Sequence, residues 1–215
     1  MRWKMRRTVI TGPTGVIGHA LIDECIRNKV EVYALCHPGS KRMADLPSHD
    51  LLHVVYVDIS RLSDAGNMIP KEIDTFYHLG WTGTFGDARN DMYLQNRNIK
   101  YALDAVELAR CCGCHTFVGA GSQAEYGRFE GKLRPSTPAF PESGYGMAKL
   151  CAGEMTRMQA RKYGMKHIWA RILSVYGPCG KKETMVMSTI IKFLHREKPS
   201  FTKGEQVWDY LYAKD

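Results

Sequence analysis

Two side chains of complementary chemistry stand four residues apart, the phenol of Tyr145 and the amine of Lys149. Residues 143–163 predict a helix that ends at Gly164, so this spacing puts both side chains on one helical face. A free phenol has a pKa of ~10, too high for a base near neutral pH, but nearby cations lower that value. The pair therefore predicts a site that moves a proton to or from a substrate hydroxyl, beside a carbon that exchanges hydride.

A third candidate, Ser122, follows a predicted strand at residues 116–119 in the segment Gly-Ala-Gly-Ser. A hydroxyl at this position can hold the substrate oxygen during proton transfer. A Y-x-x-x-K pattern alone is common on helix surfaces, and it indicates chemistry only together with the serine and a cofactor site. The predicted catalytic residues are Ser122, Tyr145 and Lys149, with no metal ion.

A glycine-rich loop lies between a predicted strand at residues 8–11 and a predicted helix at residues 15–28. Gly12 permits a tight turn, Gly15 leaves space for a pyrophosphate, and Gly18 lets the helix pack closely on the sheet. The helix N-terminus presents free N–H groups and a positive dipole end to phosphate. An ordinary turn with packing glycines is the alternative. The predicted pyrophosphate site consists of Gly12, Thr14, Gly15, Val16, Ile17 and Gly18.

The end of the second predicted strand, at residues 30–35, bears on the choice of cofactor. An acidic residue there accepts a hydrogen bond from the ribose 2′-hydroxyl of NAD, whereas a cation favours NADP. The segment that follows contains no acid and includes His37, Ser40 and Lys41. Ser40, Lys41 and Arg42 can supply a hydroxyl and cations to a 2′-phosphate, which predicts NADP, with NAD or a solvated basic loop as the alternatives.

Short apolar runs alternate with longer helical patterns along the chain. Nearly continuous apolar strands separated by helices are typical of a parallel sheet covered on both faces. The fold class predicted is α/β, a doubly wound parallel sheet of the Rossmann type, with its ligand beyond the carboxyl ends of the strands. The predicted strands are 8–11, 30–35, 53–57, 75–79, 116–119 and 167–173, and the predicted helices are 15–28, 61–69, 87–112 and 143–163.

Composition excludes several classes of protein. The 215 residues carry a net charge of +8 with 44% hydrophobic residues, which is typical of globular domains. No basic run is interleaved with aromatic residues and no stretch reaches ~20 apolar residues, so neither a nucleic-acid nor a membrane partner is predicted. Seven scattered cysteines and a basic start at residues 1–7, which lacks a signal peptide's apolar core, indicate a cytoplasmic location.

In this order, the motifs resemble the NAD-dependent epimerase/dehydratase family of extended short-chain dehydrogenases/reductases. Residues 11–18 are similar to T-G-x-x-G-x-x-G, residues 122–127 to S-x-x-x-Y-G, residues 145–149 to Y-x-x-x-K and residues 171–178 to R-x-x-N-x-Y-G-P. The resemblance implies hydride transfer at a carbon of a nucleotide-linked sugar, and a homodimer. It also implies that Lys149 and Tyr145 contact the cofactor, and that Asp58, Ile59, Leu79, Gly80, Trp81 and Asn98 bind or support it.

Four positions depart from the family pattern. Gln123 and Ala124 stand where sugar 4,6-dehydratases carry acidic residues, and neither side chain can shuttle a proton. This ranks a dehydratase below an epimerase or a reductase. Ser174 replaces the asparagine expected at that position. Trp81 is bulky where many relatives have a small residue, and it either narrows the site or fills the core.

The end of the chain suggests an incomplete second lobe. Residues 207–215 resemble the family segment R-D-F-x-Y-V-x-D, after which that lobe normally continues. We therefore expect a dinucleotide-binding domain at residues 1–174, a partial substrate-binding lobe at residues 175–215, and C-terminal truncation.

The sequence supports two hypotheses. The first is an NAD(P)-dependent epimerase or oxidoreductase that acts on a nucleotide-linked sugar. The second is an NADP-binding regulator or scaffold without catalysis, motivated by the short second lobe and by the scarcity of acid and base groups beside Ser122.

Overall fold

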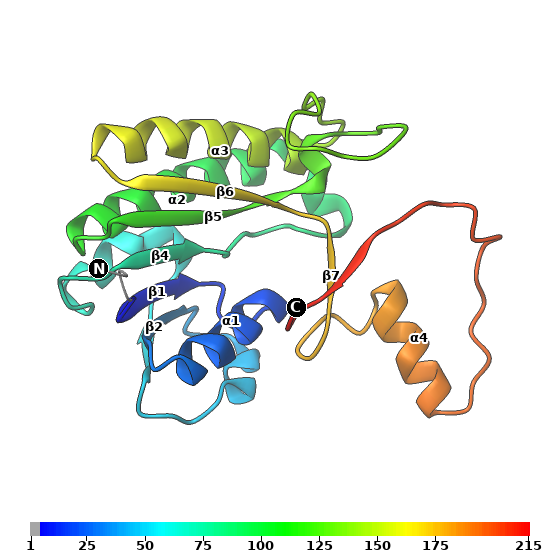
Figure 1. The fold of residues 1–215 in the computed structure, drawn as a ribbon, viewed down its shortest axis with the longest axis horizontal. Helices are drawn as coiled ribbons and strands as arrows, with labels where there is room; N and C mark the ends of the chain where they lie inside the picture. Colours follow the sequence, from blue (N-terminus) through cyan, green and yellow to red (C-terminus); the bar gives the residue numbers. More distant parts are fainter. Residues whose placement is uncertain (1–4) are drawn as a thin grey trace.

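The structure is a computed structural model that describes residues 5–215, so part of the basic segment 1–7 lies outside the described residues. Its central sheet has the strand order β3-β2-β1-β4-β5-β6, and every neighbouring pair is parallel (Figure 1). The strands are β1 (Arg7–Thr11), β2 (Glu31–Cys36), β3 (Leu52–Tyr56), β4 (Thr75–His78), β5 (Thr116–Ser122) and β6 (Lys166–Ile172). The predicted doubly wound parallel sheet is confirmed.

The strand order reverses next to β1. The chain builds β2 and β3 on one side of β1, then crosses over to build β4, β5 and β6 on the other side. Loops that leave β1 and β4 at their carboxyl ends therefore separate in opposite directions and leave a crevice between them. This topology puts the glycine loop after β1 opposite the segment that follows β4.

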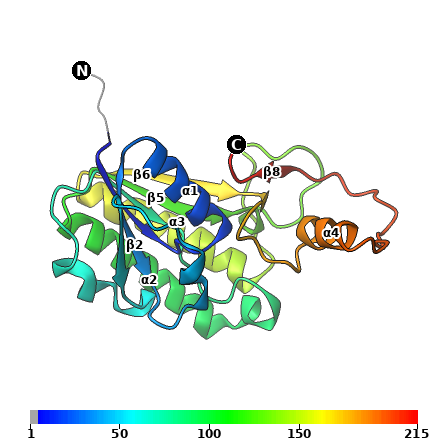
Figure 2. The same ribbon diagram turned by 90° about the horizontal axis from the view of Figure 1, so that it is seen from below.

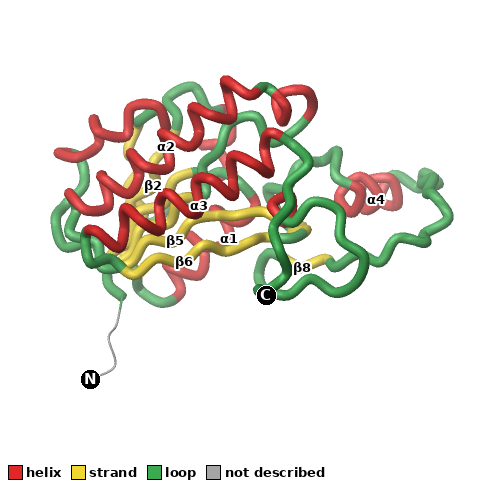
Figure 3. The backbone as a smooth tube through the Cα atoms, turned by 90° about the horizontal axis from the view of Figure 1, so that it is seen from above, coloured by secondary structure: helices red, strands yellow, loops and turns green. Residues whose placement is uncertain are grey.

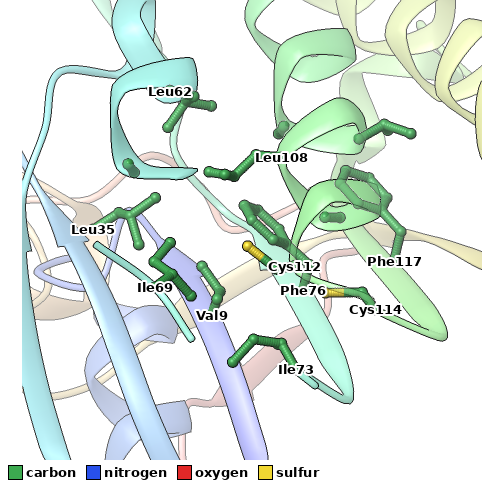
Figure 4. Close-up of a cluster of buried hydrophobic side chains, with 14 of the residues drawn as sticks. Val9, Leu35, Leu62, Ile69, Ile73, Phe76, Leu108, Cys112, Cys114 and Phe117 are labelled. Carbon is green, nitrogen blue, oxygen red and sulfur yellow. The ribbon is translucent and has the colours of Figure 1, made fainter. Parts of the chain in front are cut away.

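Helices cover both faces of the sheet. Figures 1 and 3 show α2 (Met92–Cys111) and α3 (Gly144–Lys162) side by side on one face, and α1 (Val16–Arg27) on the other. Two apolar cores follow from this arrangement. The larger lies under α2 and includes the fully buried Phe76 and Phe117 (Figure 4), while the smaller lies under α1 around Ile10 and Ile22.

The start of α2 differs from its prediction. The periodic pattern begins at residue 87, but residues 86–90 form a separate 3₁₀ turn and α2 starts at Met92. The cause is Asp91, whose Oδ1 accepts a hydrogen bond from Leu94 N at 3.0 Å and caps the helix. The short helix predicted at residues 61–69 is a 3₁₀ segment, Ile59–Asn67, with Asp58 at its N-cap.

Residues beyond β6 form a second, two-stranded sheet and one helix. Strands β7 (Ser174–Tyr176) and β8 (Tyr210–Tyr212) pair in parallel, and α4 (Met185–Leu194) projects away from the main sheet (Figure 2). No residue of α4 is buried. The domain boundary after residue 174 stays a prediction. Within residues 5–215, no helix is long and apolar enough to cross a membrane.

Candidate active site

The loop between β1 and α1 has a geometry that requires glycine at two positions. Gly12 has a φ of +67°, and a Cβ there would lie 2.8 Å from Gly80 N. A Cβ at Gly18 would lie 2.7 Å from the Cα of Pro13. Gly15 differs from both, because a Cβ added at this position would meet only Gly12 O, at 3.5 Å. Gly15 is also the N-cap of α1 and makes no side-chain cap, so the helix N-terminus is open to an anion.

A cleft of about 410 Å³ opens at the carboxyl edge of β1, β2 and β4. Its walls come from the glycine loop, from the segments after β2 and β3, from the segment after β4, and from α2. Eight predicted cofactor residues line it: Gly12, Thr14, His37, Ser40, Asp58, Ile59, Gly80 and Trp81. Predicted residues that are not part of its lining are Gly15, Val16, Ile17, Gly18, Lys41, Leu79, Asn98, Tyr145 and Lys149.

The side chains of the basic loop after β2 do not all reach the cleft. Ser40 lines the cleft, but Lys41 is exposed outside the lining, and the Arg42 guanidinium donates to the carbonyl of Cys179. His37 forms an ion pair with Asp58, with 3.0 Å between Nε2 and Oδ2. Hydrogen bonds from Ser60 lower the pKa of Asp58, and His37 adds to this effect. The side chains available to a ribose or a 2′-phosphate are therefore Ser40 and the His37–Asp58 pair.

Helix α2 contributes cleft residues that sequence reasoning missed. Leu94, Arg97 and Tyr101 line the cleft from one face of the helix. Their spacing of three and four residues is the signal that could have revealed them, because it marks one helical face. Arg97 is the residue of this set that adds a positive charge to a site for phosphate groups.

Asn98 holds the backbone of the segment that follows β4. Its Nδ2 donates to Thr82 O at 2.8 Å, and its Oδ1 accepts from Thr82 N at 3.1 Å. Gln95 adds a second anchor, since its Nε2 donates to the carbonyls of Gly83 and Ala88, both at 2.8 Å. These two buried amides fix the cleft wall that contains Trp81.

Ser122 and Tyr145 lie together at the end of β5. Burial raises the pKa of Tyr145, while hydrogen bonding with Ser122 and the charge of Arg89 act to lower it. The Arg89 guanidinium lies 4.4 Å from the centroid of the phenol ring. The phenol therefore holds its proton near neutral pH and has a hydroxyl and a cation in position to stabilise its ionised form.

Lys149 reaches from α3 to the end of β5 and packs against Trp81. Its Nζ donates to Ala120 O at 2.7 Å and lies 3.7 Å from the centroid of the Trp81 indole, but 5.8 Å from the centroid of the Tyr145 ring. Burial lowers the pKa of this amine to about 7, and the charge of Glu125 opposes that shift. The sequence predicts that Lys149 lowers the pKa of Tyr145, and in the structure Ser122 and Arg89 act in that direction.

Glu125 is enclosed by protein groups at the end of β5. The carboxylate is fully buried and accepts hydrogen bonds from Ser122 N at 2.8 Å, Trp169 Nε1 at 3.0 Å and Arg171 Nε at 2.7 Å. It braces the end of β5 against β6. With every contact directed into the protein, it is not placed to transfer protons to a ligand beside Ser122.

Replacing Glu125 with Gln should therefore destabilise the fold without any ligand present. Removing one partner of a buried ion pair costs about 3 kcal/mol, at the low end of the usual range because the Arg171 side chain keeps 24% exposure. Urea unfolding measures the loss. The matched control is Glu154→Gln, whose ion pair with Arg157 is more than half exposed, and which should cost less than about 1 kcal/mol. Equal losses in the two variants would contradict a bracing role for Glu125.

Comparison with known proteins assigns the family. Residues 8–215 match the model of the NAD dependent epimerase/dehydratase family, and the chain belongs to this family. It is 25% identical to the uncharacterized UDP-glucose epimerase YtcB of Bacillus subtilis, over 97% of this chain and 69% of that protein. It is 24% identical to the dTDP-6-deoxy-L-talose 4-dehydrogenase (NAD(+)) of Aggregatibacter actinomycetemcomitans, over 96% of this chain and 76% of that protein.

Solved structures share the fold. The UDP-N-acetylglucosamine 4-epimerase of Methanobrevibacter ruminantium superposes with a TM-score of 0.86 at 23% identity, covering 99% of this chain and 70% of that one. The UDP-glucuronic acid 4-epimerase of Bacillus cereus, solved with NAD, superposes with a TM-score of 0.81 at 21% identity, covering 96% and 68%. The match extends over nearly the whole of this chain, so the fold class is that of the nucleotide-sugar epimerases.

Proposed function

We propose that this protein is an NAD(P)-dependent epimerase or oxidoreductase that acts on a nucleotide-linked sugar. The observation that carries the proposal is the pairing of Ser122 with the Tyr145 phenol at the end of β5, next to a cleft that opens at the strand-order reversal. Family membership and relatives named as nucleotide-sugar epimerases and dehydrogenases support the same reaction class.

The residues of the cleft fit a dinucleotide. Gly15 leaves the N-terminus of α1 open, where a pyrophosphate finds backbone N–H donors and a positive dipole end. Ser40 and His37 stand at the end of β2, and the nearby Asp58 carboxylate is paired with His37 Nε2 at 3.0 Å. We infer that NADP is accepted there as well as NAD, with Ser40 as the hydroxyl donor.

Tyr145 is the proposed acid/base. In its ionised form, after losing its own proton to solvent, its Oη takes the proton of a sugar hydroxyl as the carbon that bears this hydroxyl loses hydride, and Ser122 holds the same oxygen. When bound, the dinucleotide supplies the hydride acceptor. Tyr145 returns the proton in an epimerase and loses it to solvent in a dehydrogenase. Lys149, the third predicted catalytic residue, is proposed to hold the cofactor ribose and to stabilise the phenolate by its charge.

Two larger-scale features belong to the same proposal. Residues 175–215 contribute to the sugar-nucleotide site, since β7 continues directly from the segment after β6. A homodimer forms through α2 and α3, whose outer faces carry exposed apolar side chains such as Tyr93 and Met158.

The test is an assay for reduced nicotinamide. The chain is mixed with NAD or NADP and a panel of UDP-, dTDP- and GDP-linked sugars, and the absorbance of the reduced cofactor is followed. Reduction, or conversion of one sugar into its epimer, supports the proposal. A well-folded chain that binds cofactor but converts no sugar in the panel would instead support the second candidate, a cofactor-binding protein without turnover. One observation favours that candidate: neither Tyr145 nor Lys149 lines the cleft.

A further inference from the structure

The indole of Trp81 separates the cleft from Lys149. Trp81 lines the cleft, whereas Lys149 is 3% exposed and is absent from its walls. The Lys149 Nζ lies 3.7 Å from the centroid of the indole. Anything in the cleft that reaches for this amine therefore meets the indole first.

The orientation of the indole is fixed from behind. Trp81 Nε1 donates a hydrogen bond to Gln95 Oε1 at 2.9 Å, and Gln95 itself is buried and held by two backbone carbonyls. The indole also packs edge-on against the Tyr145 ring, with 6.2 Å between centroids and an interplanar angle of 88°. Trp81 thus contacts both members of the Tyr-Lys pair.

The cation–π contact with Trp81 stabilises the charged form of the Lys149 amine. A buried ammonium has three N–H donors. Among residues 5–215, Lys149 donates to Ala120 O and lies over the π face of Trp81, with the Tyr145 and Trp169 rings farther from Nζ. The Glu125 carboxylate is engaged by Arg171 instead. A desolvated cation over an indole face is among the stronger cation–π contacts. A ligand that displaces the indole must therefore compensate for the lost cation–π contact with its own contacts to the amine.

We propose that Trp81 is a positioning residue that competes with the nicotinamide half of the cofactor for the Lys149 amine. The inference rests on the proposed function, in which Lys149 holds the cofactor ribose. For the ribose hydroxyls to reach Nζ, the indole must leave its position over the amine. Loss of the contact between the indole and the amine then weakens binding of the whole dinucleotide. Binding of the adenosine half alone leaves this contact in place and is not weakened.

The test compares Trp81→Ala with the wild type by calorimetric titration of two probes, NADP and ADP. The variant is expected to bind NADP about tenfold more tightly, a change that corresponds to ~1.4 kcal/mol, and to bind ADP as the wild type does. Trp81→Phe keeps a weaker cation–π contact and should lie between the two. Phe129→Ala is the matched control, since Phe129 is half-exposed and lies outside the cleft lining, and neither affinity should change.

A second measurement needs no cofactor. Lys149 is acetylated with acetic anhydride and quantified by mass spectrometry of its peptide, and it should react slowly in the wild type and faster in Trp81→Ala. Looser or unchanged NADP binding in the variant would overturn the competition, as would equal acetylation in the two proteins. If Trp81→Ala does not fold, Trp81→Phe decides by the same comparisons. If the wild type binds neither probe, the proposed function fails, and the acetylation result still decides whether Trp81 covers Lys149.

Discussion

Replacing Tyr145 with Phe is expected to lower kcat by about 10²–10⁴-fold, the usual contribution of a positioned acid–base group. The variant lacks the hydroxyl that hydrogen-bonds with Ser122 but keeps the ring that contacts Trp81 and Arg89. Cofactor affinity should therefore stay close to that of the wild type. Steady-state kinetics with the sugar identified in the panel, together with calorimetry, measures both quantities.

The control for this substitution is Tyr163→Phe. Tyr163 follows the last turn of α3, where its hydroxyl donates to Glu107, far from the cleft. This variant should keep the wild-type kcat. If Tyr145→Phe loses cofactor binding and turnover in parallel, the tyrosine supports the structure of the site and is not the acid/base.

Replacing Lys149 with Met is expected to stabilise the fold at pH 6 while it removes the amine required by the proposed mechanism. Burial lowers the pKa of this amine from 10.5 to about 7. Between pH 7 and 10.5 the unfolded chain therefore binds more protons than the folded chain, and stability rises with pH across this window. At pH 7 and below the charged amine weakens the fold by on the order of 4 kcal/mol.

The methionine side chain removes this penalty but leaves Ala120 O without its donor. The net gain expected at pH 6 is roughly 2–3 kcal/mol, and it should fall to zero or reverse by about pH 10. Urea unfolding of both proteins at several pH values measures the difference. Lys162→Met, at an exposed position on the same helix, should show no pH-dependent change. A Lys149→Met protein that is less stable than the wild type at pH 6 would contradict the account of this amine.

The sequence alone predicts the sheet well. Strands such as β1 and β2 are buried on both faces, so they appear as continuous apolar runs, and their predicted bounds lie within one residue of those observed at either end. The start of α2 was predicted five residues early, because Asp87 and Asp91 are both acceptable caps and only the fold decides which one is used. Right-handed crossovers restrict the arrangement of parallel strands, but the order β3-β2-β1-β4-β5-β6 depends on contacts between distant segments and is not contained in short-range patterns.

The site is predictable only where its geometry is local. Tyr145 and Lys149 share a helical face by their spacing, and Gly12 to Gly18 form one turn. The direction of a long side chain is not local. Lys149 bends toward Ala120 and Trp81, which belong to β5 and to the segment after β4, and no pattern within α3 indicates this. Likewise, Arg97 reaches the cleft only because α2 crosses the carboxyl end of β4.

Calorimetric titration of NADP and NAD into the wild type and into Gly15→Val tests the central claim, that the loop after β1 holds a dinucleotide. Gly15 has a φ of −79° and space for a Cβ, so valine should leave the fold intact and shift the melting temperature by only a few degrees. We expect one cofactor bound per wild-type chain and a loss of affinity of at least about tenfold in the variant, whose side chain occupies the pyrophosphate position. A folded wild type that binds neither cofactor, or a Gly15→Val protein that binds as tightly as the wild type, would contradict it.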